Sequence, residues 1–181
     1  MKTIPTAIHD LVIVEPAVFG DERGFFVETW SAARFAEAGI EESFVQDNHS
    51  RSARGVLRGL HYQVNRPQGK LVRVAAGCVF DAVVDLRRSS PSFGKWVGVE
   101  LSAENKRMLW VPPGLGHGFL TLADGTDFLY KCTDYYSPQD ERSIRWDDPD
   151  IGIIWPVDGL TPRLSAKDQA GTSFADAELY A

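Results

Sequence analysis

The sequence predicts an all-β protein whose strands run antiparallel in a sandwich or barrel. Short β-type segments recur along the 181 residues, and Gly, Pro, Asn, Asp or Ser residues bound each of them. Several segments alternate with a period of two residues. Within residues 79–86, for example, Phe80, Ala82 and Val84 fall on one face, and Asp81 and Asp85 fall on the other. The regular spacing without intervening helices argues against a parallel α/β sheet.

The expected elements follow one another without a repeat or an obvious linker. We expect strands within residues 10–16, 24–30, 43–50, 55–63, 70–77, 78–86, 95–102, 107–113, 117–123 and 127–136. One clear helix is predicted at residues 31–39, capped by Thr29 or Ser31 and ended by Gly39, and a second short helix is expected near the C-terminus. We therefore expect residues 1–181 to form a single domain.

Composition and charge exclude several function classes. The net charge of −6 argues against a general nucleic-acid or membrane-surface role, because such proteins usually present a basic face. Pro5, His9 and Asp10 interrupt the first residues, so no signal peptide is predicted, and no later run reaches the roughly 18 apolar residues of a membrane span. Cys78 and Cys132 could pair, but free thiols in a reducing compartment are favoured. We expect a cytoplasmic protein.

Two short motifs refine the fold class. Gly55 and His61 have the spacing that begins the first cupin motif, G-x5-H-x-H, and Pro112, Gly114 and His117 match the second, P-x-G-x-x-H. Each motif alone is weak, but both occur in the expected order in an all-β chain. The chain thus resembles cupins, which implies a jelly-roll antiparallel β-sandwich or barrel with a few short peripheral helices.

The metal ligands of the cupin motif are missing from this chain. Gln63 stands where the motif has its second histidine, and the glutamate position falls near Pro67 or Gln68. Neutral carboxamides are poor ligands for transition metals, so we expect no metal. A pocket would remain inside the barrel, lined by His61, Lys70, His117 and Tyr130.

A more specific resemblance extends over nearly the whole chain. The segments "DERGFFVE", "QDNHSRSARGVLRGLHYQ", "QGKLVRV", "VVDLRRSSPSFGKW", "WVPPGLGHGF", "YKCTDYYSP" and "LSAKD" occur in order between residues 19 and 168. Together they resemble the dTDP-4-dehydrorhamnose 3,5-epimerase family. The resemblance implies a homodimer that acts on a dTDP-linked 4-keto-6-deoxyhexose. It implies no cofactor, because the ketone of the substrate acidifies the neighbouring carbons, and no NAD-type glycine fingerprint is present.

The resemblance assigns catalytic roles to four residues. His61 would be the base and Asp168 would orient its ring; a lone strand histidine could otherwise belong to the core, and Asp168 could be a cap residue. An imidazole with a pKa near 6.5 suits removal of a proton next to a ketone. Lys70, otherwise a surface lysine, would stabilise the enolate oxygen at C4. Tyr130, otherwise a packed aromatic, would deliver a proton from the opposite face of the sugar.

Ten further residues are expected to bind the substrate. Arginine forks suit a diphosphate, Tyr136 would stack on thymine, and the remaining polar groups would contact the nucleotide sugar. Arg23 and Glu28 could instead be an exposed pair, or an N-terminal strand could carry them to the neighbouring subunit. The expected binding residues are Arg23, Glu28, Gln46, Asp47, Asn48, Arg58, His117, Tyr136, Glu141 and Lys167.

The expected reaction is inversion at C3 and C5, which yields dTDP-4-dehydro-L-rhamnose. The sequence leaves three alternatives open: an epimerase acting at C3 or C5 alone, a metal-dependent cupin enzyme, and a non-catalytic sugar-binding cupin.

One local expectation concerns the predicted strand at residues 55–63. Simple alternation puts Arg58 and His61 on opposite faces, so both can reach one ligand only if the strand bends or bulges at Gly59.

Overall fold

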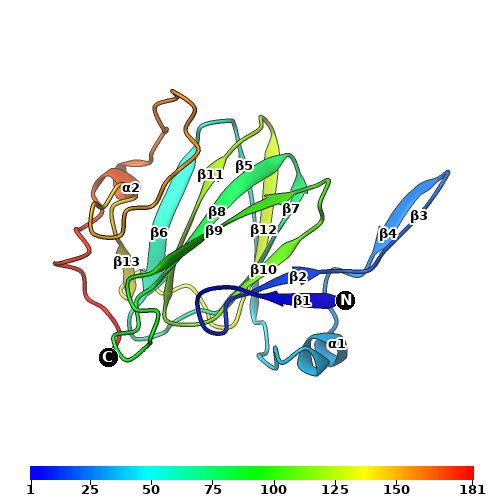
Figure 1. Cartoon of the computed structure of the whole chain (residues 1–181), viewed down its shortest axis with the longest axis horizontal. Coiled ribbons are helices and arrows are strands. Elements are labelled where there is room, and N and C mark those ends of the chain that lie inside the picture. The colour runs from blue at the N-terminus through cyan, green and yellow to red at the C-terminus, as the bar shows by residue number, and fades with distance from the viewer.

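A computed structural model describes residues 1–181 as an almost entirely β structure (Figure 1). The strands are β1 (Lys2–Pro5), β2 (Val12–Glu15), β3 (Val18–Asp21), β4 (Gly24–Val27), β5 (Gln46–Ser52), β6 (Leu57–Gln63), β7 (Lys70–Ala76), β8 (Cys78–Asp85), β9 (Trp96–Ser102), β10 (Met108–Val111), β11 (Leu115–Thr121), β12 (Thr126–Cys132) and β13 (Glu141–Ser143). The helices are α1 (Ala32–Glu37) and α2 (Ala166–Gln169). Neither helix could cross a membrane.

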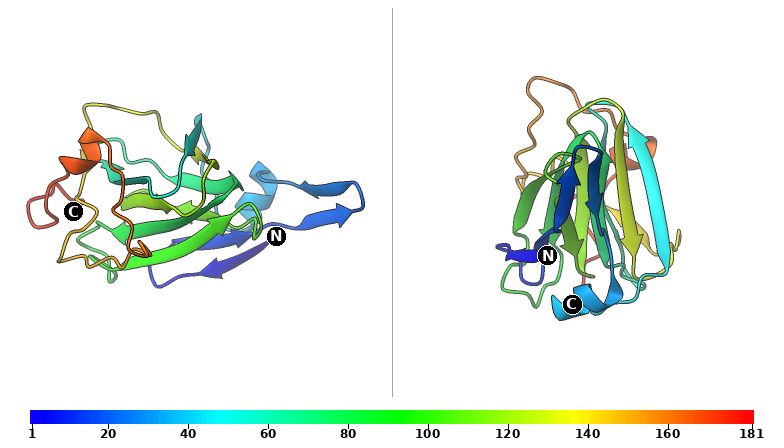
Figure 2. Two further views of the ribbon diagram at one scale, coloured as in Figure 1. Left: turned by 90° about the horizontal axis from the view of Figure 1, so that it is seen from above. Right: turned by 90° about the vertical axis from the view of Figure 1, so that its right-hand side faces the viewer.

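The strands form two large antiparallel sheets. One sheet has six strands in the order β1-β2-β10-β7-β12-β5, and the other has five in the order β13-β6-β11-β8-β9. Most neighbours in each sheet are far apart in sequence, as a jelly roll requires, and Figure 2 shows the sheets from two further directions. The predicted fold class, an all-β cupin-type jelly roll with few short helices, is confirmed.

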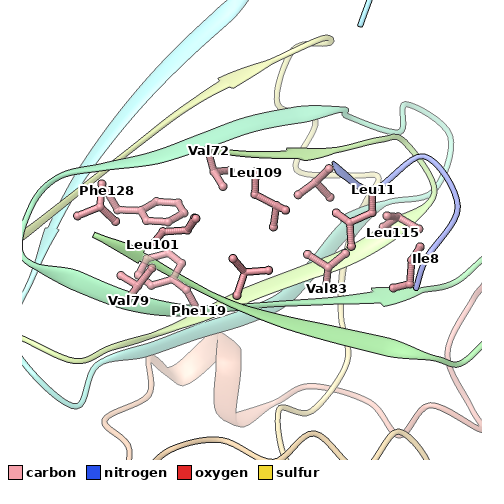
Figure 3. Packing of buried hydrophobic residues seen from close by; sticks show 13 residues of the cluster. Ile8, Leu11, Val72, Val79, Val83, Leu101, Leu109, Leu115, Phe119 and Phe128 are labelled. Atoms are coloured by element: carbon pink, nitrogen blue, oxygen red, sulfur yellow. The ribbon is translucent and has the colours of Figure 1, made fainter. Parts of the chain in front are cut away.

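Apolar side chains from both sheets meet between the two layers. Val72, Leu109 and Phe128 come from the six-stranded sheet and cluster with residues such as Val83 and Phe119 from the five-stranded sheet (Figure 3). All five are buried. Burial of this cluster stabilises the contact between the two sheets, because each Å² of apolar surface removed from water contributes about 25 cal/mol of free energy.

The five-stranded sheet is buried on its second face as well. Phe80, Ala82 and Val84 share one face of β8, as the alternation predicts, and they pack in one cluster with Ile144 and Trp155 from the C-terminal part of the chain. The C-terminal segment therefore covers the outer face of this sheet. Its last residues reach back to the end of β8, where the Tyr180 amide donates to the Leu86 carbonyl.

The ten expected strands are all present, and the structure adds three short ones. β1, β3 and β13 were not predicted, because none of them contains the run of three apolar residues that marks the equally short β2, β4 and β10. Ser31 is the N-cap of α1, and Gly39 follows its end with a φ of +82°. β3 and β4 pair only with each other and project from the body of the molecule (Figure 1).

Candidate active site

A pocket of about 370 Å³ opens between the two sheets. Side chains from both sheets and from α2 line it, and most of them are polar or charged. The lining residues are Gln46, Asn48, Ser50, Arg58, His61, Tyr62, Gln63, Gln68, Lys70, His117, Gly118, Phe119, Phe128, Tyr130, Tyr136, Glu141 and Lys167. Ten of the fourteen residues expected to act in catalysis or binding are among them.

A bulge in β6 brings Arg58 and His61 into the same pocket. His117 pairs with His61 and Phe119 pairs with Arg58, so the register between β6 and β11 shifts and β6 carries an extra residue. Gly59 lies at the bulge with a φ of +116°. A Cβ added there would lie 2.5 Å from the Cα of Gly118, so only glycine allows this approach. The expected bend at Gly59 is confirmed.

His61 is paired with a buried carboxylate that lies far away in sequence. Its Nε2 lies 2.6 Å from Oδ1 of Asp168 on α2, and the Asp168 side chain is 3% exposed. The Gly59 amide also donates to Oδ1, and the Ser165 hydroxyl donates to Oδ2. With Nε2–H held by Asp168, Nδ1 is the ring nitrogen that remains to accept a proton.

The surroundings of the pair keep His61 neutral and Asp168 charged. Burial lowers the pKa of His61; the hydrogen bond to Asp168 opposes this change, and the positive charge of Lys167 adds to it. Burial works against ionisation of Asp168, but hydrogen bonds from His61, Ser165 and the Gly59 amide hold its pKa well below its usual range. A neutral imidazole beside a carboxylate can act as a general base near neutral pH.

The opposite sheet contributes an ammonium and a phenol. Lys70 is the first residue of β7 and Tyr130 lies on β12, and both line the pocket opposite β6. Burial lowers the pKa of Lys70, whereas Asp81 and Glu141 oppose the change. Burial raises the pKa of Tyr130, so the phenol is protonated and can donate a proton. A ligand between the sheets would have His61 on one side and Tyr130 on the other.

A second imidazole–carboxylate pair forms the deeper wall of the pocket. Nε2 of His117 lies 2.9 Å from Oδ2 of Asp81, and both side chains are buried. Burial raises the pKa of Asp81, and the nearby His117 opposes this change. The His117 ring stacks on Phe128. Asp81 was missed as a site residue, although its place on the face of β8 opposite Phe80 could have indicated it.

A charged network borders the pocket at β13 and α2. Lys167 Nζ lies 2.5 Å from Oε1 of Glu141, and the Tyr136 hydroxyl donates to Oε2 of the same carboxylate. Gln46 accepts a hydrogen bond from the Tyr136 amide and donates to Asn48. These five side chains were all expected to bind substrate, and the fold brings them together.

Three expected binding residues do not line this pocket. Arg23 is at the exposed β3–β4 hairpin and pairs with Asp21, and Glu28 pairs with Arg34 near α1. Asp47 lies between Gln46 and Asn48 on β5, so its side chain is on the opposite face of the strand from theirs. It forms an ion pair with Lys131 at 2.9 Å. The alternative in which Arg23 and Glu28 form an exposed pair with each other is wrong, because each has another partner within this chain.

Gln63, at the position of the missing metal ligand, stabilises a loop. Its Nε2 donates to the carbonyls of Arg66 and Tyr135, and its Oε1 accepts from the Ser137 amide. The residues around the pocket include no group of three His, Cys, Asp or Glu side chains that could hold a metal.

Comparison with known proteins identifies the family. A family model described as dTDP-4-dehydrorhamnose 3,5-epimerase matches residues 5–176. The chain belongs to the dTDP-4-dehydrorhamnose 3,5-epimerase family. A member from Pseudomonas aeruginosa is 57% identical over 181 residues, which cover 99% of each chain. One from Salmonella typhimurium is 59% identical over 172 residues, covering 94% of this chain and 93% of its own.

A solved structure supports the same family assignment. The epimerase from Legionella pneumophila, in complex with dTDP-4-keto-L-rhamnose, superimposes with a TM-score of 0.95 at 54% identity. The match covers 98% of this chain and 94% of that chain. The family resemblance of the sequence is thereby confirmed.

Proposed function

We propose that this protein is a dTDP-4-dehydrorhamnose 3,5-epimerase that converts dTDP-4-dehydro-6-deoxy-D-glucose into dTDP-4-dehydro-L-rhamnose. The observation that carries the proposal is the placement of His61 with Asp168 on one wall of the pocket and Lys70 with Tyr130 on the other. A base and an acid on opposite sides of one ligand are what inversion at a carbon requires. The names of relatives at 57% and 59% identity favour inversion of both centres over inversion of one.

The proposed reaction uses the acidity of carbons next to the C4 ketone. Neutral His61 removes the proton from C5, the C–H electron pair forms a C4–C5 double bond, and an enolate results with its negative charge on the C4 oxygen. The ammonium of Lys70 stabilises that charge. The Tyr130 hydroxyl then protonates the carbon from the other face, and the C4 ketone is restored.

The other centre, C3, is inverted by the same steps. Between the steps, His61 gives up its proton and Tyr130 regains one by exchange with solvent. The Asp168 carboxylate stabilises the imidazolium that forms each time, as an orienting acid does in a hydrolase triad. No redox step occurs, so the proposed reaction needs no redox cofactor.

Substrate binding is proposed to use the polar side chains around the pocket. Arg58 and Lys167 would contact the diphosphate, since both carry positive charge and line the pocket. Tyr136, which is half exposed at the pocket, would stack on thymine. Gln46 and Asn48 would hydrogen-bond the nucleotide. The proposed binding set is completed by His117 and Glu141, which also line the pocket, whereas Asp47 lies outside it.

We further infer a homodimer in which the β3–β4 hairpin reaches the partner's pocket. Phe19, Phe25 and Phe26 on the hairpin are 62–67% exposed, which is a large apolar area for a projecting arm. Arg23 and Glu28 lie on the same arm or directly after it, outside the pocket of their own chain. In a dimer, these two residues would complete the site of the neighbouring subunit.

A cytoplasmic location is also part of the proposal. Cys78 and Cys132 are both free thiols in this structure. Free thiols persist in a reducing compartment, whereas disulfides are common in secreted proteins. The two cysteines therefore support the cytoplasmic location that the sequence predicts.

One experiment tests the reaction directly. The EDTA-treated protein is incubated with dTDP-4-dehydro-6-deoxy-D-glucose in D2O, and deuterium at C3 and C5 is measured by NMR. Incorporation at both carbons supports the proposal. Incorporation at one carbon would mean a single-centre epimerase, and no incorporation would exclude this enzymatic function. Loss of activity on EDTA treatment, restored by added metal, would favour a metal-dependent cupin enzyme.

A further inference from the structure

The carboxylate that supports the proposed base is held at both of its oxygens. Oδ1 of Asp168 accepts from Nε2 of His61 at 2.6 Å and from the Gly59 amide at 3.1 Å. Oδ2 accepts from the Ser165 hydroxyl at 2.6 Å. Ser165 is therefore the side chain that fixes the second oxygen, and so the rotation of the carboxylate about its Cβ–Cγ bond.

The same hydroxyl also caps the helix that carries Asp168. Ser165 is the N-cap of α2, and its Oγ accepts from the Asp168 amide at 3.2 Å. A hydroxyl can accept one hydrogen bond and donate another, so both contacts form together. Capping alone would be a structural role. A test must therefore distinguish the effect of the hydrogen bond donated to Oδ2 from the effect of capping the helix.

We propose that Ser165 is a positioning residue for proton transfer, which keeps Oδ1 of Asp168 directed at the His61 ring. The proposal rests on the roles given above to His61 and Asp168. Asp168 is nearly fully buried, so an unsatisfied Oδ2 would be costly, and the carboxylate would turn toward any other donor. Turning would weaken the hydrogen bond that orients His61.

The chain contains a matched control for this contact. The Ser173 hydroxyl donates to Oδ2 of Asp176 at 2.6 Å, and the Asp176 amide donates back to Ser173 Oγ at 3.2 Å. The spacing and both distances equal those of the pair formed by Ser165 and Asp168. Asp176, however, is exposed and has no histidine partner. Equal substitutions at the two serines therefore compare the same local motif when its aspartate is hydrogen-bonded to the proposed base and when it is not.

The test compares Ser165→Val with Ser165→Thr, which have nearly the same shape and differ in the hydroxyl. We expect Ser165→Val to lower kcat about 10-fold or more with KM nearly unchanged, because a hydrogen bond to a charged group is lost. Ser165→Thr should recover kcat to within about threefold of the parent, and Ser173→Val should leave it within about twofold. Equal kcat for the Val and Thr variants at position 165 would overturn the proposal.

A double-mutant cycle with Asp168→Ala identifies the group through which Ser165 acts. The amide that Ser165 caps is still present in Asp168→Ala, but the carboxylate is gone. We expect Ser165→Val to cause no further loss of deuterium exchange in that background. An equal further loss would mean that Ser165 acts only through the helix. Full activity of Asp168→Ala alone would instead contradict the proposed roles of His61 and Asp168.

Discussion

His61 on β6 and His117 on β11 are direct partners in the antiparallel register of the five-stranded sheet. Each imidazole is hydrogen-bonded through Nε2 to a buried carboxylate. The two rings differ in access, because the side chain of His61 is 25% exposed and that of His117 is 7% exposed. His61 is therefore the imidazole that a substrate can reach for proton transfer, and His117 belongs to the wall behind it.

This difference predicts that His61→Asn abolishes deuterium exchange at both C3 and C5. Asparagine keeps a similar size and polarity but cannot act as a base near neutral pH. A loss on the order of 10²–10⁴-fold is expected for a general base, measured by NMR in D2O. His49→Asn is the control, since His49 also pairs with an aspartate, Asp127, but lies outside the pocket. Exchange at a normal rate in His61→Asn would show that another residue removes the proton.

Tyr130→Phe should separate proton exchange from inversion. The variant keeps the aromatic ring that packs near Phe128, but the proton donor on the wall opposite His61 is lost. His61 can still remove a proton and return a deuteron to the same face, so some exchange should persist while the inverted product falls by about 10²-fold or more. The measurement is deuterium content against product stereochemistry in one NMR sample. Equal loss of both would contradict the role of Tyr130 as the opposite-face acid.

The pH dependence follows from the direction of the His61 shift. The base must be neutral, and burial lowers the pKa of His61, so kcat/KM should fall only when the pH drops below about 6.5. The hydrogen bond to Asp168 raises the pKa of His61 and so partly offsets burial. In Asp168→Asn, the fall of kcat/KM on acidification should therefore occur at a still lower pH, and the maximal kcat/KM should also be lower. A shift of this fall to higher pH would contradict the pairing.

The proposed exchange of hairpins predicts complementation between two defective subunits. Arg23→Ala damages the arm, and His61→Asn damages the body, so each homodimer should be weakly active. A hybrid dimer, purified with two affinity tags after co-expression, has one intact site and should show about half of the wild-type activity. Activity no higher than the mean of the two parents would show that Arg23 does not serve the partner's site.

Gly59→Ala should destabilise the protein and disable the site. The added Cβ would lie 2.5 Å from the Gly118 Cα and 2.6 Å from the His117 carbonyl oxygen, both backbone atoms. Overlap and the positive φ together should cost at least about 3 kcal/mol, measured by chemical denaturation. Gly125→Ala is the control, because its φ is +65° but nothing lies within 4 Å of an added Cβ. It should cost about 1 kcal/mol. Equal losses of stability in the two variants would show that the close approach at Gly59 is not what requires glycine there.

The sequence by itself determined the fold class, ten of the thirteen strands and most of the pocket residues. Strand alternation is local, so the order of residues along the chain is enough to place Phe80, Ala82 and Val84 on one face. The two cupin-like motifs placed His61 and His117, and the family resemblance added Lys70 and Tyr130.

The family resemblance implied that Asp168 orients His61, but only the tertiary structure gives the geometry of that hydrogen bond and reveals the contact of Asp81 with His117. Both contacts join residues that are far apart in the chain, and no local pattern encodes them. The local motif of Ser165 and Asp168 recurs at Ser173 and Asp176, and what the tertiary structure adds is that the other oxygen of Asp168 accepts from His61 and from the Gly59 amide. The fold also placed Arg23 on a projecting hairpin, away from the pocket of its own chain.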